Sequence, residues 1–187
     1  MRDRYRLSVV FGLNQICELQ LIKTCDEIGR LVILAADIWN EYFPSLIGQP
    51  QVDYMLQKFQ SESVISNHMQ DGWQYYFIIA GNKPVGYIGI YQDKQSQVVE
   101  LSKFYVQAMS RCQGIGKMAL TQLIENEILP KMKRISLRVN KDNRIAISAY
   151  QRMGFNKIAE DVVDIGNGFV MDDFIFEKSL VDNVCLR

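Results

Sequence analysis

The stretch QVVELSKFYVQAMSRCQGIGKMAL, residues 97–120, holds the most informative pattern in this sequence. Its first part, 97–106, is rich in β-branched and aromatic residues and predicts a strand. An Arg111-x-x-Gly-x-Gly loop follows, and apolar residues at helical spacing then predict a helix to Leu129. A strand, a glycine-rich loop and a helix N-terminus in this order are typical of a site for an anion such as pyrophosphate. The reason is that backbone N–H groups and the positive end of the helix dipole face the ligand.

The Gly-x-Gly pattern alone is a weak signal, because many such loops are only tight turns. A Walker A loop requires Gly-x-x-x-x-Gly-Lys-Ser/Thr, whereas here Lys117 is followed by Met118. The dinucleotide fingerprint requires a third glycine where Ala119 stands, which is a tolerated variant. The strand-helix alternation of a doubly wound fold is missing upstream, so both of these nucleotide-binding classes are disfavoured.

The segments on either side of this stretch predict a single domain over residues 18–180, flanked by an N-terminal extension, 1–17, and a C-terminal tail, 181–187. The order β-α-α-β-β-β-α-β-α-β-β predicts an α/β (α+β) protein, a mixed sheet with helices on both faces. The expected elements are a strand at 18–24, a helix capped by Asp26 and ended by Pro44, a helix at 51–67, a hairpin of 73–80 and 85–91, a strand at 134–139, a helix at 145–153, and strands at 155–158 and 169–177.

Composition excludes several classes of protein. The chain has 187 residues, with 21 Lys and Arg against 21 Asp and Glu, and a generic nucleic-acid binder should carry a basic excess. With 48% hydrophobic residues it is not a disordered protein. Cys17, Cys25, Cys112 and Cys185 form no CxxC pair, and His68 is the single histidine, so we expect reduced thiols, no metal site and a cytoplasmic location. No stretch reaches the ~20 apolar residues of a membrane span.

Two motifs in this order resemble the GCN5-related N-acetyltransferase (GNAT) family. Residues 97–120 resemble its acetyl-CoA-binding motif. Asn143-Arg-Ile-Ala, followed by Tyr150 and Gly154-Phe155, resembles its next motif, N-x-x-A-x-x-x-Y-x-x-x-G-F. The resemblance covers about residues 18–180. It implies the GNAT fold, a mostly antiparallel twisted sheet of six to seven strands, with acetyl-CoA as co-substrate and direct attack by an amine in a ternary complex.

The resemblance also implies a set of cofactor-binding residues. The loop amides and Arg111 would hold the pyrophosphate of CoA. The strand backbone would pair with the pantetheine, and one strand amide would polarise the thioester carbonyl. Asn143 and Ala146 would border the CoA arm. Cys112 is expected to be a small loop residue and no nucleophile. The full set is Phe104, Tyr105, Val106, Arg111, Cys112, Gln113, Gly114, Ile115, Gly116, Lys117, Asn143 and Ala146.

Two residues are candidates for proton transfer. The resemblance makes Tyr150 the acid that protonates the leaving thiolate; the alternative is a tyrosine packed on a helix face. Glu100 stands where some members of the family carry a catalytic glutamate, and an alkylamine must lose a proton before it attacks. Other members use water chains, and Glu100 is alternatively a strand residue facing solvent or in an ion pair. We expect His68 to be a surface or capping residue.

The distribution of charge bears on the acceptor. Residues 101–157 contain eleven Lys and Arg and three acids, a local charge of +8, and the remainder carries −8. A basic part suits the CoA phosphates, and an acidic part suits either a cationic acceptor or plain solvation. The segment 39–44 and the pair at 172–173 resemble the polyamine (spermidine) acetyltransferase branch. Aromatic residues that either line an acceptor pocket or belong to the core are Trp39, Tyr42, Phe43, Tyr75 and Tyr76.

Three hypotheses follow. The first is an acetyl-CoA-dependent N-acetyltransferase of a primary amine on a small cationic molecule. The second keeps the chemistry but makes the acceptor a protein N-terminus or a lysine side chain. The third is a sensor domain that binds acyl-CoA without turnover. Many relatives dimerise through the later strands, so a homodimer is a candidate assembly, whereas neither nucleic acid nor a membrane is an expected partner.

Overall fold

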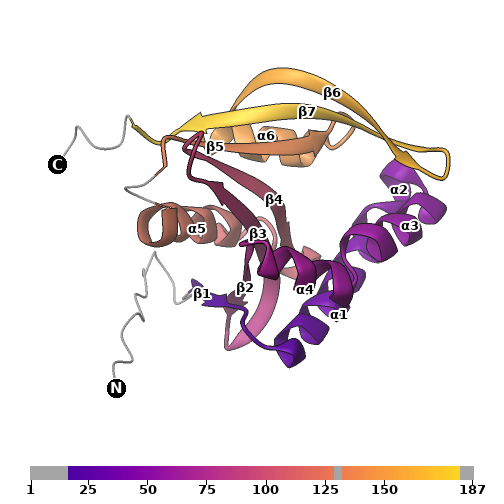
Figure 1. The fold of residues 1–187 in the computed structure, drawn as a ribbon, viewed down its shortest axis with the longest axis horizontal. Helices are drawn as coiled ribbons and strands as arrows, with labels where there is room; N and C mark the ends of the chain where they lie inside the picture. The colour runs from indigo at the N-terminus through magenta and orange to yellow at the C-terminus, as the bar shows by residue number, and fades with distance from the viewer. Residues whose placement is uncertain (1–16, 129–131, 182–187) are drawn as a thin grey trace.

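The computed structural model describes residues 17–128 and 132–181 (Figure 1). Some of the expected features lie outside the described residues. These are the N-terminal extension apart from Cys17, the helix end at Leu129, Cys185, and most of the C-terminal tail. None of the helices in the described ranges is both long enough and apolar enough to cross a membrane.

In the described part of the chain, seven strands form one sheet in the order β1-β2-β3-β4-β5-β7-β6. Every neighbouring pair is antiparallel except β4 and β5, which run parallel. The mixed, mostly antiparallel sheet that the sequence predicts is therefore confirmed. The strands are β1 Cys17–Leu21, β2 Gln74–Ala80, β3 Lys83–Asp93, β4 Val98–Val106, β5 Arg134–Asn140, β6 Asn156–Gly166 and β7 Phe169–Ser179.

Helices cover both faces of the sheet (Figure 1). The first four, α1 to α4, pack on one face, where α1 and α4 bury Tyr75, Phe77 and Tyr87 of the sheet. The later helices pack on the other face, over a core that includes Val99 and Leu101 of β4. The helical segments are α1 Cys25–Tyr42, α2 Pro44–Ile47, α3 Gln49–Phe59, α4 Glu62–Gln70, the 3-10 turn η1 Ala108–Ser110, α5 Ile115–Gln122, the π-helical η2 Leu123–Ile128 and α6 Arg144–Arg152.

Several expected boundaries are wrong, each for a local reason. Thr24 caps α1 in place of Asp26, because Thr24 and Glu27 form a reciprocal capping box. The end expected before Pro44 is correct, since α1 ends at Tyr42, but Pro44 also begins the short helix α2, where its missing N–H has no partner to lose. The expected helix 51–67 is interrupted at Gln60, which leaves the helical conformation and buries its side chain.

The last hairpin also differs from the expectation. β6 extends over 156–166, well past the predicted end at 158. It is an edge strand of the sheet, and most of its side chains are exposed. Because most side chains of this edge strand face solvent, its sequence does not need to alternate apolar and polar residues. The strand pattern in the sequence is therefore weak.

β4 and β5 separate along their length. They pair only over 98–100 with 134–136, so the later part of β4 has an edge that β5 does not cover. β4 also carries a bulge at Ser102, which has no partner on β3. The bulge shifts the alternation of side chains, so that Leu101 and Phe104 both face the α5 core, while Lys103 faces the α1 side. The separation and the bulge together shape the site described next.

Candidate functional site

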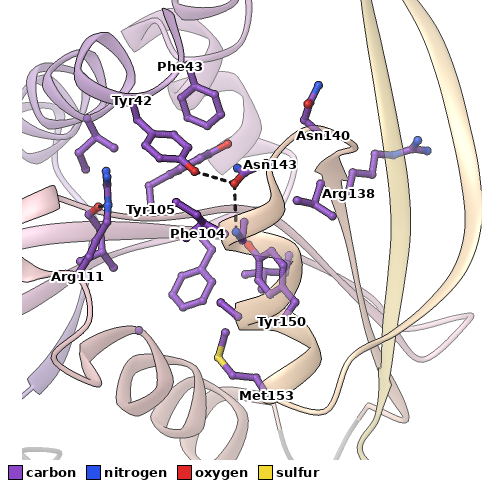
Figure 2. A pocket seen from close by; sticks show the side chains of 18 of the residues that line it. Tyr42, Phe43, Phe104, Tyr105, Arg111, Arg138, Asn140, Asn143, Tyr150 and Met153 are labelled. Carbon is purple, nitrogen blue, oxygen red and sulfur yellow. Dashed lines mark hydrogen bonds between the residues drawn. The ribbon is translucent and has the colours of Figure 1, made fainter. Parts of the chain in front are cut away.

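Two cavities lie beside the separated strands. The α6 cavity, of about 250 Å³, lies between β4, β5, α1 and α6 (Figure 2). The α3 cavity, of about 590 Å³, lies between the same strands, α1, α3 and β7. Six residues line both cavities and mark where they meet: Phe43, Leu101, Ser102, Tyr105, Arg138 and Asn140. Two molecules bound in the two cavities would therefore approach each other at the gap between β4 and β5.

The open edge of β4 borders the α6 cavity. A Cβ on Gly86 of β3 would collide with the carbonyl oxygen of Tyr105, so that carbonyl faces β3. Because backbone groups of successive strand residues face opposite sides, Phe104 and Val106 turn theirs to the open edge. The Val106 carbonyl accepts a 2.7 Å hydrogen bond from Nε of Arg111. Of the three strand residues expected to pair with pantetheine, Phe104 and Val106 thus present backbone to the cavity, and Tyr105 contributes its side chain.

Arg111 faces the α6 cavity. Its guanidinium lies 4.8 Å from the ring centre of Tyr42 and 3.9 Å from the carboxylate of Glu41, both on α1. With the bond to Val106, these contacts tie the loop before α5 to α1 and β4. The structure therefore places Arg111 along the wall of the cavity, where its charge is available to an anionic ligand but its position is set by protein contacts.

The glycine-rich loop leads into α5 as the motif predicts. Gly114 is the N-cap of α5 with φ of 80°, a left-handed conformation that favours glycine. Cys112 also has positive φ, at 60°, and both it and Lys117 are exposed. The first turn of a helix has N–H groups without intrahelical partners, here those of residues 115–117. The loop thus offers backbone donors and the Lys117 ammonium to solvent, as an anion site requires.

Asn143 joins two elements of the site. Its Oδ1 accepts hydrogen bonds from the hydroxyl of Tyr42, at 2.8 Å, and from the backbone N–H of Ala146, at 3.1 Å (Figure 2). Asn143 is therefore the N-cap of α6 and also the attachment of α1 to that helix. Both Asn143 and Ala146 line the α6 cavity.

Tyr150 on α6 lines the same cavity and is half-buried. Its ring packs near Phe104 and Phe155, with ring centres 6.4 Å and 5.6 Å away. Within the described ranges, no residue forms a hydrogen bond with its hydroxyl. Burial raises the pKa of this phenol well above its ordinary value, so Tyr150 is protonated at neutral pH. The geometry therefore provides an uncommitted proton donor in the α6 cavity.

Glu100 belongs to the other cavity. It lines the α3 cavity with Lys103, and its side chain is exposed there. Burial lowers the pKa of Lys103 to about 8, and the nearby Glu100 carboxylate opposes this shift. Tyr150 and Glu100, the two candidates for proton transfer, are thus on opposite sides of β4.

Other residues of the α3 cavity escaped the sequence analysis. Asp173 on β7 was noticed only as part of an acidic pair, and its side chain is nine-tenths buried. Burial raises its pKa to about 6, and the Arg138 guanidinium opposes that shift. Gln60 gave no signal in the sequence. His68, expected at the surface, stacks on Trp73 with 5.0 Å between ring centres and lines the cavity.

The expectation for the aromatic residues holds in part. Trp39 lines the α3 cavity, Tyr42 the α6 cavity, and Phe43 both. Tyr75 and Tyr76 follow the other alternative: they line neither cavity and are buried in the cores on the two faces of the sheet. Neighbouring strand residues face opposite sides, so both can be buried only because helices cover both faces.

The separation of charge along the sequence is largely cancelled in space. Basic residues of β5, of the turn that follows it and of β6, all from the part with charge +8, form ion pairs with acids of β6 and β7, from the remainder. These pairs are Arg134 with Glu177, Arg138 with Asp161, Lys141 with Glu160 and Asp172, and Lys157 with Glu160. Many of the charges therefore stabilise the sheet surface and do not create two opposed fields.

Comparison with known proteins gives a family and a fold. The model of the acetyltransferase (GNAT) family matches residues 34–155, about two thirds of the chain. A search of curated proteins finds no match.

Several solved structures share the fold. The PaiA N-acetyltransferase of Thermoplasma acidophilum, in complex with coenzyme A, is 18% identical, with a TM-score of 0.71 over 87% of this chain and 98% of its own. The ribosomal-protein-alanine N-acetyltransferase of Brucella melitensis is 21% identical, with a TM-score of 0.63 over 87% and 99%. A chimera of the spermidine N-acetyltransferase SpeG of Vibrio cholerae and hSSAT is 14% identical, with a TM-score of 0.65 over 89% and 96%. The names of the last two specify different acceptors, so the shared fold does not select one.

Proposed function

As a member of the acetyltransferase (GNAT) family, this chain is an N-acetyltransferase, and we propose that it transfers the acetyl group of acetyl-CoA directly to a primary amine of a small cationic acceptor. The observation that carries this proposal is the pair of cavities that meet where β4 and β5 separate. The α6 cavity takes the donor, the α3 cavity takes the acceptor, and the two react at the gap.

The α6 cavity fits the donor. The open backbone edge at Phe104 and Val106 can pair with the amides of a pantetheine arm. The space beside Gly116, at the start of α5, is open. A Cβ built on Gly116 would meet only the Phe104 ring, at an ordinary contact distance of 3.6 Å. We assign the pyrophosphate to the loop amides from Gln113 to Lys117, with support from the Arg111 charge. Bound acetyl-CoA supplies the activated acetyl thioester.

Proton transfer is divided between the two sides of β4. Tyr150 holds its proton at neutral pH and donates it to the thiolate that leaves. Glu100, in the α3 cavity, takes the proton that the acceptor ammonium must lose before attack. Their placement in separate cavities suits an acid that serves the donor and a base that serves the acceptor.

The lining of the α3 cavity supports a small cationic acceptor. Aromatic residues such as Trp39, Phe43 and Trp73 surround an alkyl or cationic group favourably. Arg138, which also lines the cavity, is paired with Asp161, whereas the carboxylate of Asp173 is buried and forms no ion pair with a described residue. Polyamines are one class of such acceptors, suggested by the weak likeness to the spermidine branch.

The proposal is tested by acetyl-CoA turnover, followed as thiol release, with a panel of small amines, amino acids and peptides. We expect release with small amines and little with peptides that carry a free N-terminus or a lysine. Release with peptides alone would shift the acceptor to a protein. Binding of acetyl-CoA without release for any amine would make the chain a sensor and overturn the proposal.

We also propose that residues 18–180 act as one domain and that two copies pair through the outer hairpin. β6 is an edge strand, and its Ile158 and Val162 are exposed. An unpaired edge with apolar side chains is a surface on which another sheet can pair. Sedimentation of the purified chain would distinguish a dimer from a monomer.

A further inference from the structure

The wall of the α3 cavity contains a buried donor without an acceptor. Gln60 is 1% exposed, and among the described residues its Nε2 has no hydrogen-bond partner. An unpaired buried polar group costs about 1–3 kcal/mol. Proteins retain such a group only where something else compensates for it, and a ligand in the cavity that Gln60 lines is one such compensation.

A chain of hydrogen bonds fixes which end of the Gln60 amide is unpaired. The Trp39 indole N–H donates to the hydroxyl of Tyr87, at 3.2 Å, and that hydroxyl donates to Oε1 of Gln60, also at 3.2 Å. An indole nitrogen can only donate, so Tyr87 accepts from Trp39 and passes its own proton to Gln60. The amide oxygen is therefore occupied, and the NH₂ group is the free end.

The same cavity contains a carboxylate without a partner. The Asp173 carboxylate forms no hydrogen bond or ion pair with any residue in the described ranges, and the guanidinium of Arg138 is engaged by Asp161. Asp173 lies opposite Asn140 in the pairing of β5 with β7, and Asn140 lines both cavities. The carboxylate is thus close to the junction where the acceptor amine must be presented.

We propose that Asp173 and Gln60 hold the two ends of the acceptor, with the ammonium at the Asp173 carboxylate and an oxygen atom of the same molecule accepting from Nε2 of Gln60. This inference rests on the proposed function and narrows its acceptor class. The nitrogens of a polyamine are protonated donors at neutral pH and offer nothing to Gln60. Amines that also carry a hydroxyl, carbonyl or carboxylate oxygen complete both contacts and are preferred over polyamines.

Matched acceptors test this preference. Aminopentanol, diaminopentane and hexylamine differ at one end only, which is a hydroxyl, an ammonium or a methyl group, and shorter and longer homologues cover other spans. We expect kcat/KM for the best amino alcohol to exceed that of its matched diamine and alkylamine about tenfold or more, because the analogues leave Gln60 unpaired.

Substitutions separate the two contacts. Gln60→Glu keeps the oxygen that accepts from Tyr87 and replaces the donor, so the preference should reverse toward the diamine. Gln60→Met should bring the three rates within about twofold of one another. Asp173→Asn should raise KM for all three amines alike, by about tenfold or more. Gln51 is the matched control, because it lines the same cavity but its Nε2 donates to Val170 at 2.8 Å, and Gln51→Glu should leave the preference unchanged.

Binding of the amines to the complex with CoA, followed by fluorescence of Trp39 and Trp73, separates this inference from the proposed function. Binding that shows the predicted order and depends on both residues, without turnover, would overturn the function and sustain the inference. Turnover of all three amines at rates that Gln60→Glu and Gln60→Met leave in the same ratio would overturn the inference and sustain the function. If Gln51→Glu changed the preference between amino alcohol and diamine as much as Gln60→Glu does, the inference would also be overturned. A negative charge anywhere in the cavity would then be enough to change the preference.

Discussion

The hydroxyl of Tyr42, at the end of α1, donates a 2.8 Å hydrogen bond to Oδ1 of Asn143, the N-cap of α6. Both residues line the α6 cavity, and the bond connects helices that pack on opposite faces of the sheet (Figures 1 and 2). The width of the cavity and the capping of α6 therefore depend on the same oxygen atom.

Tyr42→Phe should weaken acetyl-CoA binding several-fold and lower the free energy of unfolding by about 1 kcal/mol, because one partly buried hydrogen bond is lost. Calorimetry and urea denaturation measure the two effects. Tyr54→Phe is the control: it removes a bond to the Ile165 carbonyl and should lower stability alone. An unchanged affinity for acetyl-CoA in Tyr42→Phe would confine the Tyr42 bond to a structural role.

Tyr150→Phe should lower kcat by about 100-fold or more with no change in thermal stability, since its hydroxyl has no protein partner among the described residues to lose. Because the raised pKa keeps the phenol protonated, the wild-type rate should show no loss from this group as pH rises to 9. Tyr76→Phe is the control. It removes a buried hydroxyl bonded to Glu127, so it should lower thermal stability and leave kcat unchanged. A kcat equal to that of the wild type would refute the acid role of Tyr150.

Glu100→Gln should reduce the rate most at low pH. There the amine is fully protonated and needs a base, whereas at high pH a growing fraction of the amine has already lost its proton. Profiles of kcat/KM against pH for the wild type and the variant measure this difference. Glu127→Gln, on the other face of the sheet, serves as the control. The same proportional loss at every pH would indicate that water accepts the proton.

Arg111→Lys should weaken acetyl-CoA binding nearly as much as Arg111→Ala, by about tenfold. A lysine cannot donate to the Val106 carbonyl and also reach the Tyr42 ring, as the guanidinium does. Calorimetric titration with acetyl-CoA tests this expectation, with Arg152→Lys at an exposed position as the control. Wild-type affinity in Arg111→Lys would show that positive charge alone matters.

Asp173→Asn should stabilise the folded protein by about 2 kcal/mol at pH 7. The pKa of Asp173 is about 6 when folded, above its ordinary value, so the folded state binds the proton more tightly than the unfolded state. Its contribution to stability therefore falls as pH rises from about 4 to 6, and the gain from Asn should disappear near pH 4. Urea denaturation at both pH values measures the difference. A stabilisation equal at both would mean that ionisation of Asp173 is not the cause.

The glycine-rich loop and the order of elements could be predicted from the sequence, because both depend on local patterns. Gly114 is needed for a left-handed residue at the start of α5, and the apolar positions of α5 recur at the helical period. The motif containing Asn143 and Tyr150 has a spacing set within one short helix, so both residues were found with their cavity. In such cases the physical constraint lies within about ten residues of the chain.

The acceptor side could not be predicted in this way. Gln60 and Asp173 are more than a hundred residues apart, on α3's C-terminal end and on β7, and nothing in their neighbours indicates a shared cavity. The charge separation along the chain was likewise misleading, since sheet pairing brings Arg138 against Asp161.

The sequence by itself determined the family motifs, the glycine-rich loop and the position of Tyr150 on α6, because these rest on backbone conformation and helical spacing. Only the tertiary structure decided where β4 separates from β5, that a bulge at Ser102 shifts the side chains of that strand, and that Tyr150 and Glu100 face different cavities. These features depend on pairing between distant strands and on burial, and neither is encoded in any single stretch of residues.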